Sequence, residues 1–172
     1  MQITEGSIVI DRPVADVFAF VSDVQNDPTW HTTVVGGRRT SPGPIGIGTT
    51  FEGVYDSQKH TLDTPAQPSN FQRVEAVIVE FTLNRALRLR VVFPDPPRGV
   101  GARVLGRTFD LTFRFEAVPE GTRVYRGGEI HPMAVIRLVA PLLLRANSGR
   151  NDYLLANLKR AIEGRVAPVP AP

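Results

Sequence analysis

The sequence contains no cysteine and only three histidines, His31, His60 and His131. Without cysteine the chain has no disulfide, no thiolate nucleophile and no cysteine-ligated zinc or iron–sulfur site. The histidines are far apart, and none stands in an HExxH or similar arrangement of metal ligands. The sequence therefore predicts no metal site.

Long hydrophobic runs are also absent. The longest apolar stretch, Met133–Leu144, spans 12 residues and is interrupted by Arg137 and Pro141. A helix needs about 20 apolar residues to cross ~30 Å of hydrocarbon. The opening segment MQITEGSIVIDRP lacks the basic region, apolar run and cleavage site of a signal peptide. We therefore expect no transmembrane segment and a cytoplasmic location.

Basic residues are in small excess, with 20 Lys and Arg against 17 Asp and Glu and a net charge of +3. The arginines are spread along the chain and form no block of like charge, so we expect no nucleic-acid partner. Gly46–Gly48 and Gly99–Gly101 lack the further glycines and the strand–helix context of a nucleotide-binding loop. We interpret both segments as turns and expect no cofactor.

What the sequence does have is enough apolar residues, 42% of 172, for one sizeable core. A chain of this length buries roughly 70% of its unfolded surface, so it needs no staple to fold. We expect a single domain over residues 1–166. The Pro/Ala-rich tail, 167–172, has no periodic apolar face and is expected to be disordered.

The first elements expected are a strand, Gln2–Ile10, and a helix that starts after Pro13. Proline suits the first turn of a helix, and Val14, Val17, Phe18 and Val21 form one apolar stripe. The segment Asp23–Trp30 has turn chemistry and allows at most a second short helix.

The middle of the chain is predicted to form consecutive antiparallel strands. Apolar and polar residues alternate most clearly in Leu87–Phe93 and Phe109–Phe115, so each of these strands has a dry and a wet face. Six runs separated by turn residues read as strands: Val34–Val35, Thr49–Tyr55, Val74–Thr82, Leu87–Phe93, Arg107–Glu116 and Thr122–His131.

A long C-terminal helix, from about Ala134 to Gly164, supplies the cover for the dry face. Pro141 is expected to kink this helix or to begin its main part. Strands followed by a helix predict an α+β fold with an antiparallel sheet covered on one face. The segments Ser57–Asn70 and Pro94–Gly106 are long for hairpin loops, and each is interpreted as a functional lid or a mobile insertion.

Four segments in this order resemble the START-like superfamily of polyketide cyclase/dehydrase and lipid-transport proteins, also called SRPBCC proteins: SIVIDRPVADVFAFVSDVQNDPTWH, GIGTTFEGVY, FRFEAVPEGTRVYRGGEI and PLLLRANSGRNDYLLANLKRAIEG. The resemblance covers nearly the whole chain. It implies a START/Bet v 1-like helix-grip fold, in which a curved seven-stranded antiparallel sheet wraps around the C-terminal helix and encloses an apolar cavity. Family members bind lipids, polyketides or hormones, and some are enzymes, so the fold does not settle the function.

The candidate ligand-binding residues lie on the expected walls of that cavity. Trp30 lines the cavity or is plain core packing, and Tyr55 supplies an apolar wall with one polar group unless its hydroxyl reaches the surface. His31 is either a donor at the cavity mouth or an exposed residue. The full set is Trp30, Phe51, Tyr55, Phe93, Phe113, Arg126 and Leu142.

Arg126 is the anomaly in this set. If Val124 and Ile130 face inward, Arg126 does too, and a buried arginine must meet an acid, a ligand anion or water. The alternative is a bulge at Gly127–Gly128, or an edge position, that leaves Arg126 in solvent.

The leading functional hypothesis is binding of a hydrophobic small molecule in the cavity by a monomer or homodimer. The second is a polyketide cyclase or dehydrase acting there without metal, and the third is an interaction module with a vestigial cavity. No Ser/His/Asp order or paired carboxylates mark catalytic residues.

Overall fold

The computed structural model describes residues 2–56, 58–59, 61–95, 107–130 and 148–164. In chain order its elements are β1 (Gln2–Ile10), α1 (Val14–Ser22), the 3-10 helix η1 (Val24–Thr29), β2 (Val34–Arg39), β3 (Thr50–Asp56), the 3-10 helix η2 (Pro68–Asn70), β4 (Phe71–Thr82), β5 (Ala86–Val92), β6 (Thr108–Val118), β7 (Gly121–Ile130) and α4 (Ser148–Glu163).

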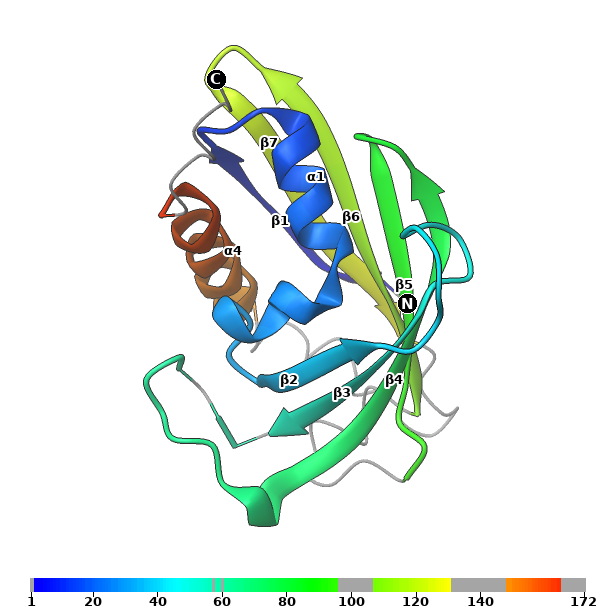
Figure 1. Ribbon diagram of the computed structural model, residues 1–172. Helices are drawn as coiled ribbons and strands as arrows, with labels where there is room; N and C mark the ends of the chain where they lie inside the picture. Colours follow the sequence, from blue (N-terminus) through cyan, green and yellow to red (C-terminus); the bar gives the residue numbers. More distant parts are fainter. Residues whose placement is uncertain (1, 57, 60, 96–106, 131–147, 165–172) are drawn as a thin grey trace, which may run out of the picture.

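The strands form one seven-stranded antiparallel sheet in the order β1-β7-β6-β5-β4-β3-β2. The predicted α+β fold and curved sheet are thus confirmed, and Figure 1 shows α1, η1 and α4 on the concave face of the sheet. Three strands are longer than predicted, because β2 continues to Arg39, β4 begins at Phe71 and β6 continues to Val118.

Helix α1 begins after Pro13, as the sequence predicts, and carries Asp16 in its first turn, where the helix dipole favours an acid. The stripe residues Val17, Phe18 and Val21 are buried. The Phe18 ring meets Phe81 and Phe115 edge-on, with ring centroids 5.0 and 5.2 Å apart. This packing holds α1 over the middle of the sheet.

Helix α4 packs along β1 through the predicted apolar stripe, of which Leu154, Leu155 and Leu158 are almost fully buried. Lys159 Nζ donates to the Val9 carbonyl at 2.6 Å. The first part of the expected C-terminal helix, 134–147, lies outside the described residues, and so do the tail and Pro141. None of the described helices is long and apolar enough to cross a membrane.

The long connecting segments meet at one end of the sheet, here named the loop end. Asp56 pairs with Phe71 where β3 meets β4, Val92 pairs with Thr108 where β5 meets β6, and β7 ends at Ile130. Because neighbouring strands are antiparallel, all these termini lie at the same edge. The loop end is therefore the edge at which β3, β5 and β7 end and β4 and β6 begin.

Candidate functional site

Strand pairing decides which side chains reach the concave face. Residues opposite each other on paired strands point to the same face of the sheet. Phe113 pairs with Leu87 on one side and with Arg126 on the other, and both Phe113 and Leu87 are buried in the core. Arg126 therefore points to the concave face, in line with Val124.

Arg126 is half-buried and has defined partners on that face. Its Nη1 donates to Asn151 Oδ1 at 2.6 Å, and its Nη2 lies 3.5 Å from His31 Nε2. Its guanidinium carbon is 5.9 Å from the centroid of the Phe113 ring. The β6–β7 pairing runs without a register shift from Gly121 to Ile130, so the inward alternative holds and the proposed bulge at Gly127–Gly128 is not formed against β6.

Asp27 is a second ionisable group on this face, and sequence reasoning missed it. Burial raises its pKa from 3.8 to about 7, although the positive charge of Arg126 acts to lower it. The Trp30 indole N–H is close enough to the Asp27 carboxyl to lower this pKa as well. Its geometry falls outside that of an ordinary hydrogen bond, and it makes none with any described residue. Asp27 therefore has a carboxyl that exchanges a proton near neutral pH.

Three polar residues, His31, Arg126 and Asn151, are in contact here, and Asp27 lies within electrostatic range of Arg126; we call these four residues the polar cluster. Asp27 comes from η1, His31 from the segment after η1, Arg126 from β7 and Asn151 from the first half of α4. His31 Nδ1 lies 3.0 Å from Thr33 Oγ1, which fixes the tilt of the imidazole ring. The cluster combines a permanent cation with a carboxyl that can be charged or neutral.

Toward the loop end the concave face becomes aromatic. The ring centroid of Phe93 lies 5.9 Å from that of Tyr55 and 6.1 Å from that of Phe109. Phe93 is buried, whereas Tyr55 and Phe109 are half-buried. We call these three residues the aromatic wall, and the sequence predicted two of them.

Three other predicted ligand contacts, Trp30, Phe51 and Phe113, are core residues with 3% exposure or less. Trp30 packs edge-on against His31, with ring centroids 5.3 Å apart, and so supports the polar cluster from within the core. Contact of these three with a ligand stays a prediction. Leu142, His60 and His131 lie outside the described residues, as does the part of the C-terminal helix expected to close the cavity.

Asp56, the last residue of β3, is a buried carboxylate. Only 1% of it is exposed. The backbone N–H groups of Gln58 and Gln67 donate to its two carboxylate oxygens at 2.9 and 3.0 Å. Asp56 therefore fastens the β3–β4 connection at the loop end.

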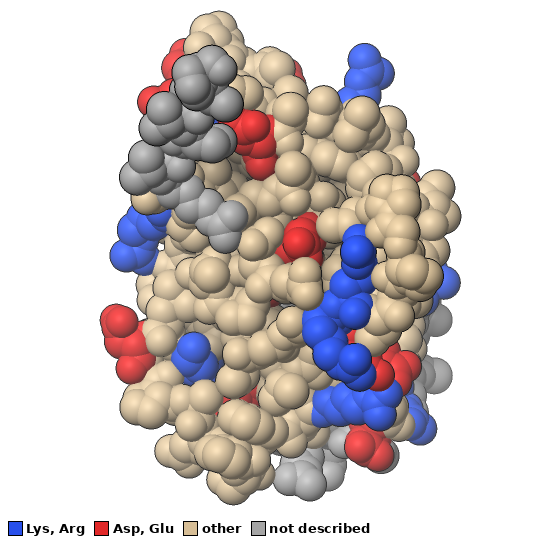
Figure 2. Space-filling model, in the orientation of Figure 1, with Lys and Arg blue, Asp and Glu red and all other residues tan. Residues whose placement is uncertain are grey.

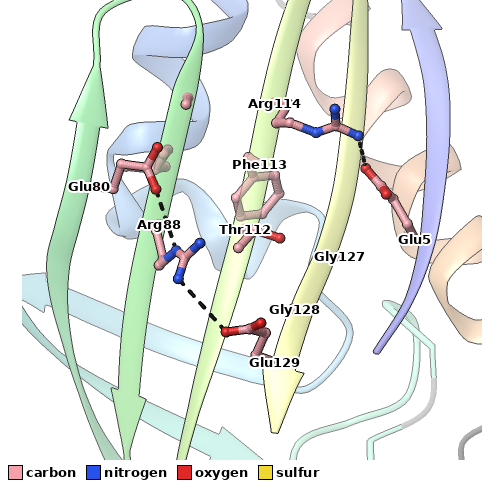
Figure 3. Close-up of a pocket in the computed structure, with 11 residues that line it drawn as sticks. Glu5, Glu80, Arg88, Thr112, Phe113, Arg114, Gly127, Gly128 and Glu129 are labelled. Atoms are coloured by element: carbon pink, nitrogen blue, oxygen red, sulfur yellow. Dashed lines mark hydrogen bonds and ion pairs between the residues drawn. The ribbon is translucent and has the colours of Figure 1, made fainter. Parts of the chain in front are cut away.

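The outer face of the sheet carries a groove of about 640 Å³ (Figure 3). Its two arginines are held by carboxylates: Arg88 lies 3.4 Å from Glu80 and 3.8 Å from Glu129, and Arg114 pairs with Glu5. Glu80 and Glu129 are thus outer-face ion-pair residues. Such half-exposed pairs contribute little energy and offer no apolar surface to a ligand.

The face seen in Figure 2 is largely uncharged, with basic side chains gathered along one flank and carboxylates among them. Pairs on neighbouring strands of the sheet include Arg38 with Glu52 at 2.6 Å and Arg73 with Glu52 at 2.9 Å. Within the described part of the chain, no three His, Asp or Glu residues gather as metal ligands.

Comparison with known protein families shows which family this chain belongs to. The model of the polyketide cyclase / dehydrase and lipid transport family matches residues 1–163. The chain belongs to this family. The START-like resemblance found in the sequence is thereby confirmed, and no curated protein matches the chain in sequence.

Solved structures confirm the Bet v 1-like helix-grip fold. Ara h 8.0201 is 11% identical, with a TM-score of 0.65, and the match covers 96% of this chain and 99% of that one. A Staphylococcus aureus protein of unknown function is 8% identical, with a TM-score of 0.64 and 95% of both chains covered. The di-domain ARO/CYC BexL from the BE-7585A biosynthetic pathway is 15% identical, with a TM-score of 0.65; the match covers 96% of this chain and 51% of that one. These identities support the fold alone.

Proposed function

We propose that this protein binds a hydrophobic small molecule on the concave face of the sheet, with the apolar part of the ligand on the aromatic wall. A site of this kind needs a largely apolar surface and a few well-placed polar groups. The aromatic wall supplies the first, and the polar cluster supplies the second. The family and its cyclase and Bet v 1-like neighbours support a ligand-binding fold.

The observation that carries the proposal is the direction of Arg126. Its side chain leaves a strand whose other inward residues, Val124 and Ile130, are fully buried, and it ends beside Phe113 and His31. The guanidinium lies at the border of an apolar core, where the charge of Arg126 already acts on Asp27. A ligand carboxylate, phenolate or carbonyl oxygen would be a further acceptor for it.

The test compares Arg126→Leu with wild type in two fluorescence titrations, one with the anionic dye 8-anilinonaphthalene-1-sulfonate and one with the uncharged N-phenyl-1-naphthylamine. We expect the variant to bind the anion more weakly by roughly 2 to 5 kcal/mol and the uncharged dye almost as wild type does. Leucine relieves the burial of charge, so the fold should tolerate it.

Arg123→Leu is the matched control, because Arg123 lies on the same strand but pairs with Val9 and Glu116 on the outer face. It should leave both titrations unchanged. Equal losses for both dyes in Arg126→Leu would rule out recognition of charge. Absence of binding of either dye to wild type would reject the ligand-binding proposal itself.

A second function, cyclase- or dehydrase-type catalysis, is favoured by the burial of Asp27 within electrostatic range of Arg126. This burial raises the pKa of Asp27 to about 7, and the efficiency of a general acid or base is greatest when its pKa lies near the operating pH. Arg126 would polarise the carbonyl while Asp27 exchanges a proton. Asp27→Asn should then abolish turnover of a poly-β-carbonyl substrate and leave its binding intact, whereas equal turnover by both proteins would reject this role.

We propose a cytoplasmic protein that acts as a monomer or homodimer and needs no metal or other cofactor. An interaction module with a filled cavity is the rival, and it predicts that wild type binds neither dye.

A further inference from the structure

Asn151 makes two hydrogen bonds to Arg126 rather than one. Its side-chain Nδ2 donates to the Arg126 carbonyl at 3.1 Å, and its Oδ1 accepts from Arg126 Nη1 at 2.6 Å. Only 7% of Asn151 is exposed. One amide therefore holds both the backbone and the charged end of the same arginine, which restricts the directions that the guanidinium can take.

A glycine makes room for this contact. Gly6 pairs with Arg126 across β1 and β7. A Cβ atom at Gly6 would lie 2.8 Å from Asn151 Nδ2 and 3.1 Å from Leu155 Cδ1, which is closer than side-chain carbons pack. The absence of a side chain on β1 thus allows α4 to approach β7 closely enough for Asn151 to reach Arg126.

The chemistry of the side chain at this position matters. An amide orients a guanidinium through hydrogen bonds but has no charge of its own, so Asn151 adds no negative charge beside Arg126. A carboxylate of the same size would form a charge-assisted pair with the guanidinium and neutralise it. The choice of Asn over Asp at position 151 therefore bears on what kind of ligand the site prefers.

We infer that Asn151 is a positioning residue that makes the site select hydrophobic anions, such as aryl or alkyl carboxylates, sulfonates and phenolates, over uncharged ligands of the same shape. It does so by holding Arg126 in place without adding a negative charge of its own. This inference rests on the proposed function, because it specifies the ligand class of the same site.

The test uses the full chain, the two dyes named above and the nearly isosteric variant Asn151→Asp. We expect Asn151→Asp to weaken binding of 8-anilinonaphthalene-1-sulfonate at least tenfold and to change binding of N-phenyl-1-naphthylamine less than twofold. The same substitution in an Arg126→Leu background should add no further loss for the anionic dye. A residue with a merely structural role would not show this dependence on Arg126.

Gly6→Ala provides a second variant, since its Cβ would push the amide of Asn151 away from Arg126. It should reduce the preference for the anionic dye in the same direction as Asn151→Asp. Gly36→Ala is the control, because a Cβ there would have no atom within 4 Å.

The outcomes distinguish a failure of the proposed function from a failure of the role assigned to Asn151. If wild type binds neither dye, the proposed function fails, and this inference fails with it. If Arg126→Leu loses the preference for the anion but Asn151→Asp keeps it, or loses both dyes equally, the inference is overturned and the proposed function stands. Loss of the preference in both Asn151→Asp and Gly6→Ala supports the inference.

Discussion

Replacing Asp27 by asparagine should change how the stability of the protein depends on pH. The carboxyl has a pKa of about 7 in the folded protein against 3.8 for the unperturbed group. Below pH 4 both states carry the proton, so Asp27 has no effect on the free energy of unfolding. Between pH 4 and 7 the folded protein keeps the proton while the unfolded chain releases it, so wild type loses about 1.4 kcal/mol per pH unit. Above pH 7 the loss is complete, at roughly 4 kcal/mol.

The asparagine side chain of the variant does not titrate, so the difference in unfolding free energy between Asp27→Asn and wild type should grow by roughly 4 kcal/mol in favour of the variant from pH 4 to pH 8. Urea unfolding followed by tryptophan fluorescence at several pH values measures it, because Trp30 is the only tryptophan and is buried. Asp16→Asn, in the exposed first turn of α1, is the control and should differ from wild type by no more than about 1 kcal/mol at every pH. A difference for Asp27→Asn that stays flat, or that shrinks with rising pH, would refute the assigned burial of this carboxyl.

Three further predictions concern the frame of the site. Gly121→Ala should destabilise the fold by more than about 1 kcal/mol, measured by urea unfolding, since Gly121 has φ +126° and a Cβ there would lie 2.2 Å from the Ile10 carbonyl. Leu158→Ala should cost about 2 to 5 kcal/mol because this side chain is fully buried, whereas Ile47→Ala, 73% exposed in the wild type, should change stability by less than about 0.5 kcal/mol. Dye binding should survive EDTA and thiol alkylation, and a loss on chelation that zinc or iron restores would reveal a metal site that the sequence does not predict.

The sheet was predictable because alternation fixes the faces of its strands. In β5 and β6 the pattern alone placed Leu87 and Phe113 inward, and the same reasoning in β7 put Arg126 on the concave face once Val124 was taken as buried. What the pattern could not decide was whether the strand stays regular past Arg126. The regularity of β7 depends on its pairing with β6, and the direction of Arg126 depends on α4, which follows only at Ser148.

The partners of Arg126 were harder to predict, although one signal was present. Asn151 stands three residues before Leu154 and four before Leu155, so it falls on the apolar stripe of α4, where a polar residue must find a buried partner. Asp27 gave no such signal, because a 3-10 helix of six residues has no stripe to interrupt. Its electrostatic interaction with Arg126 follows only from the tertiary fold, which places η1 and the Arg126 side chain on the same face of the sheet.

The pKa of Asp27 is raised, whereas the pKa of Glu163, a carboxylate that stabilises the fold, is lowered. The backbone N–H of Asp11 and the ammonium group of Lys159 lower the pKa of Glu163, so the charged form of that residue is stabilised where α4 meets the β1–α1 turn. Burial raises the pKa of Asp27, so its charged form opposes folding. Asparagine would fill the same space without that penalty, and groups retained against stability concentrate at functional sites. If Asp27→Asn stabilises the protein at pH 8 and also alters dye selectivity or turnover, Asp27 belongs to the site; if it stabilises the protein and leaves both unchanged, Asp27 is only a buried acid.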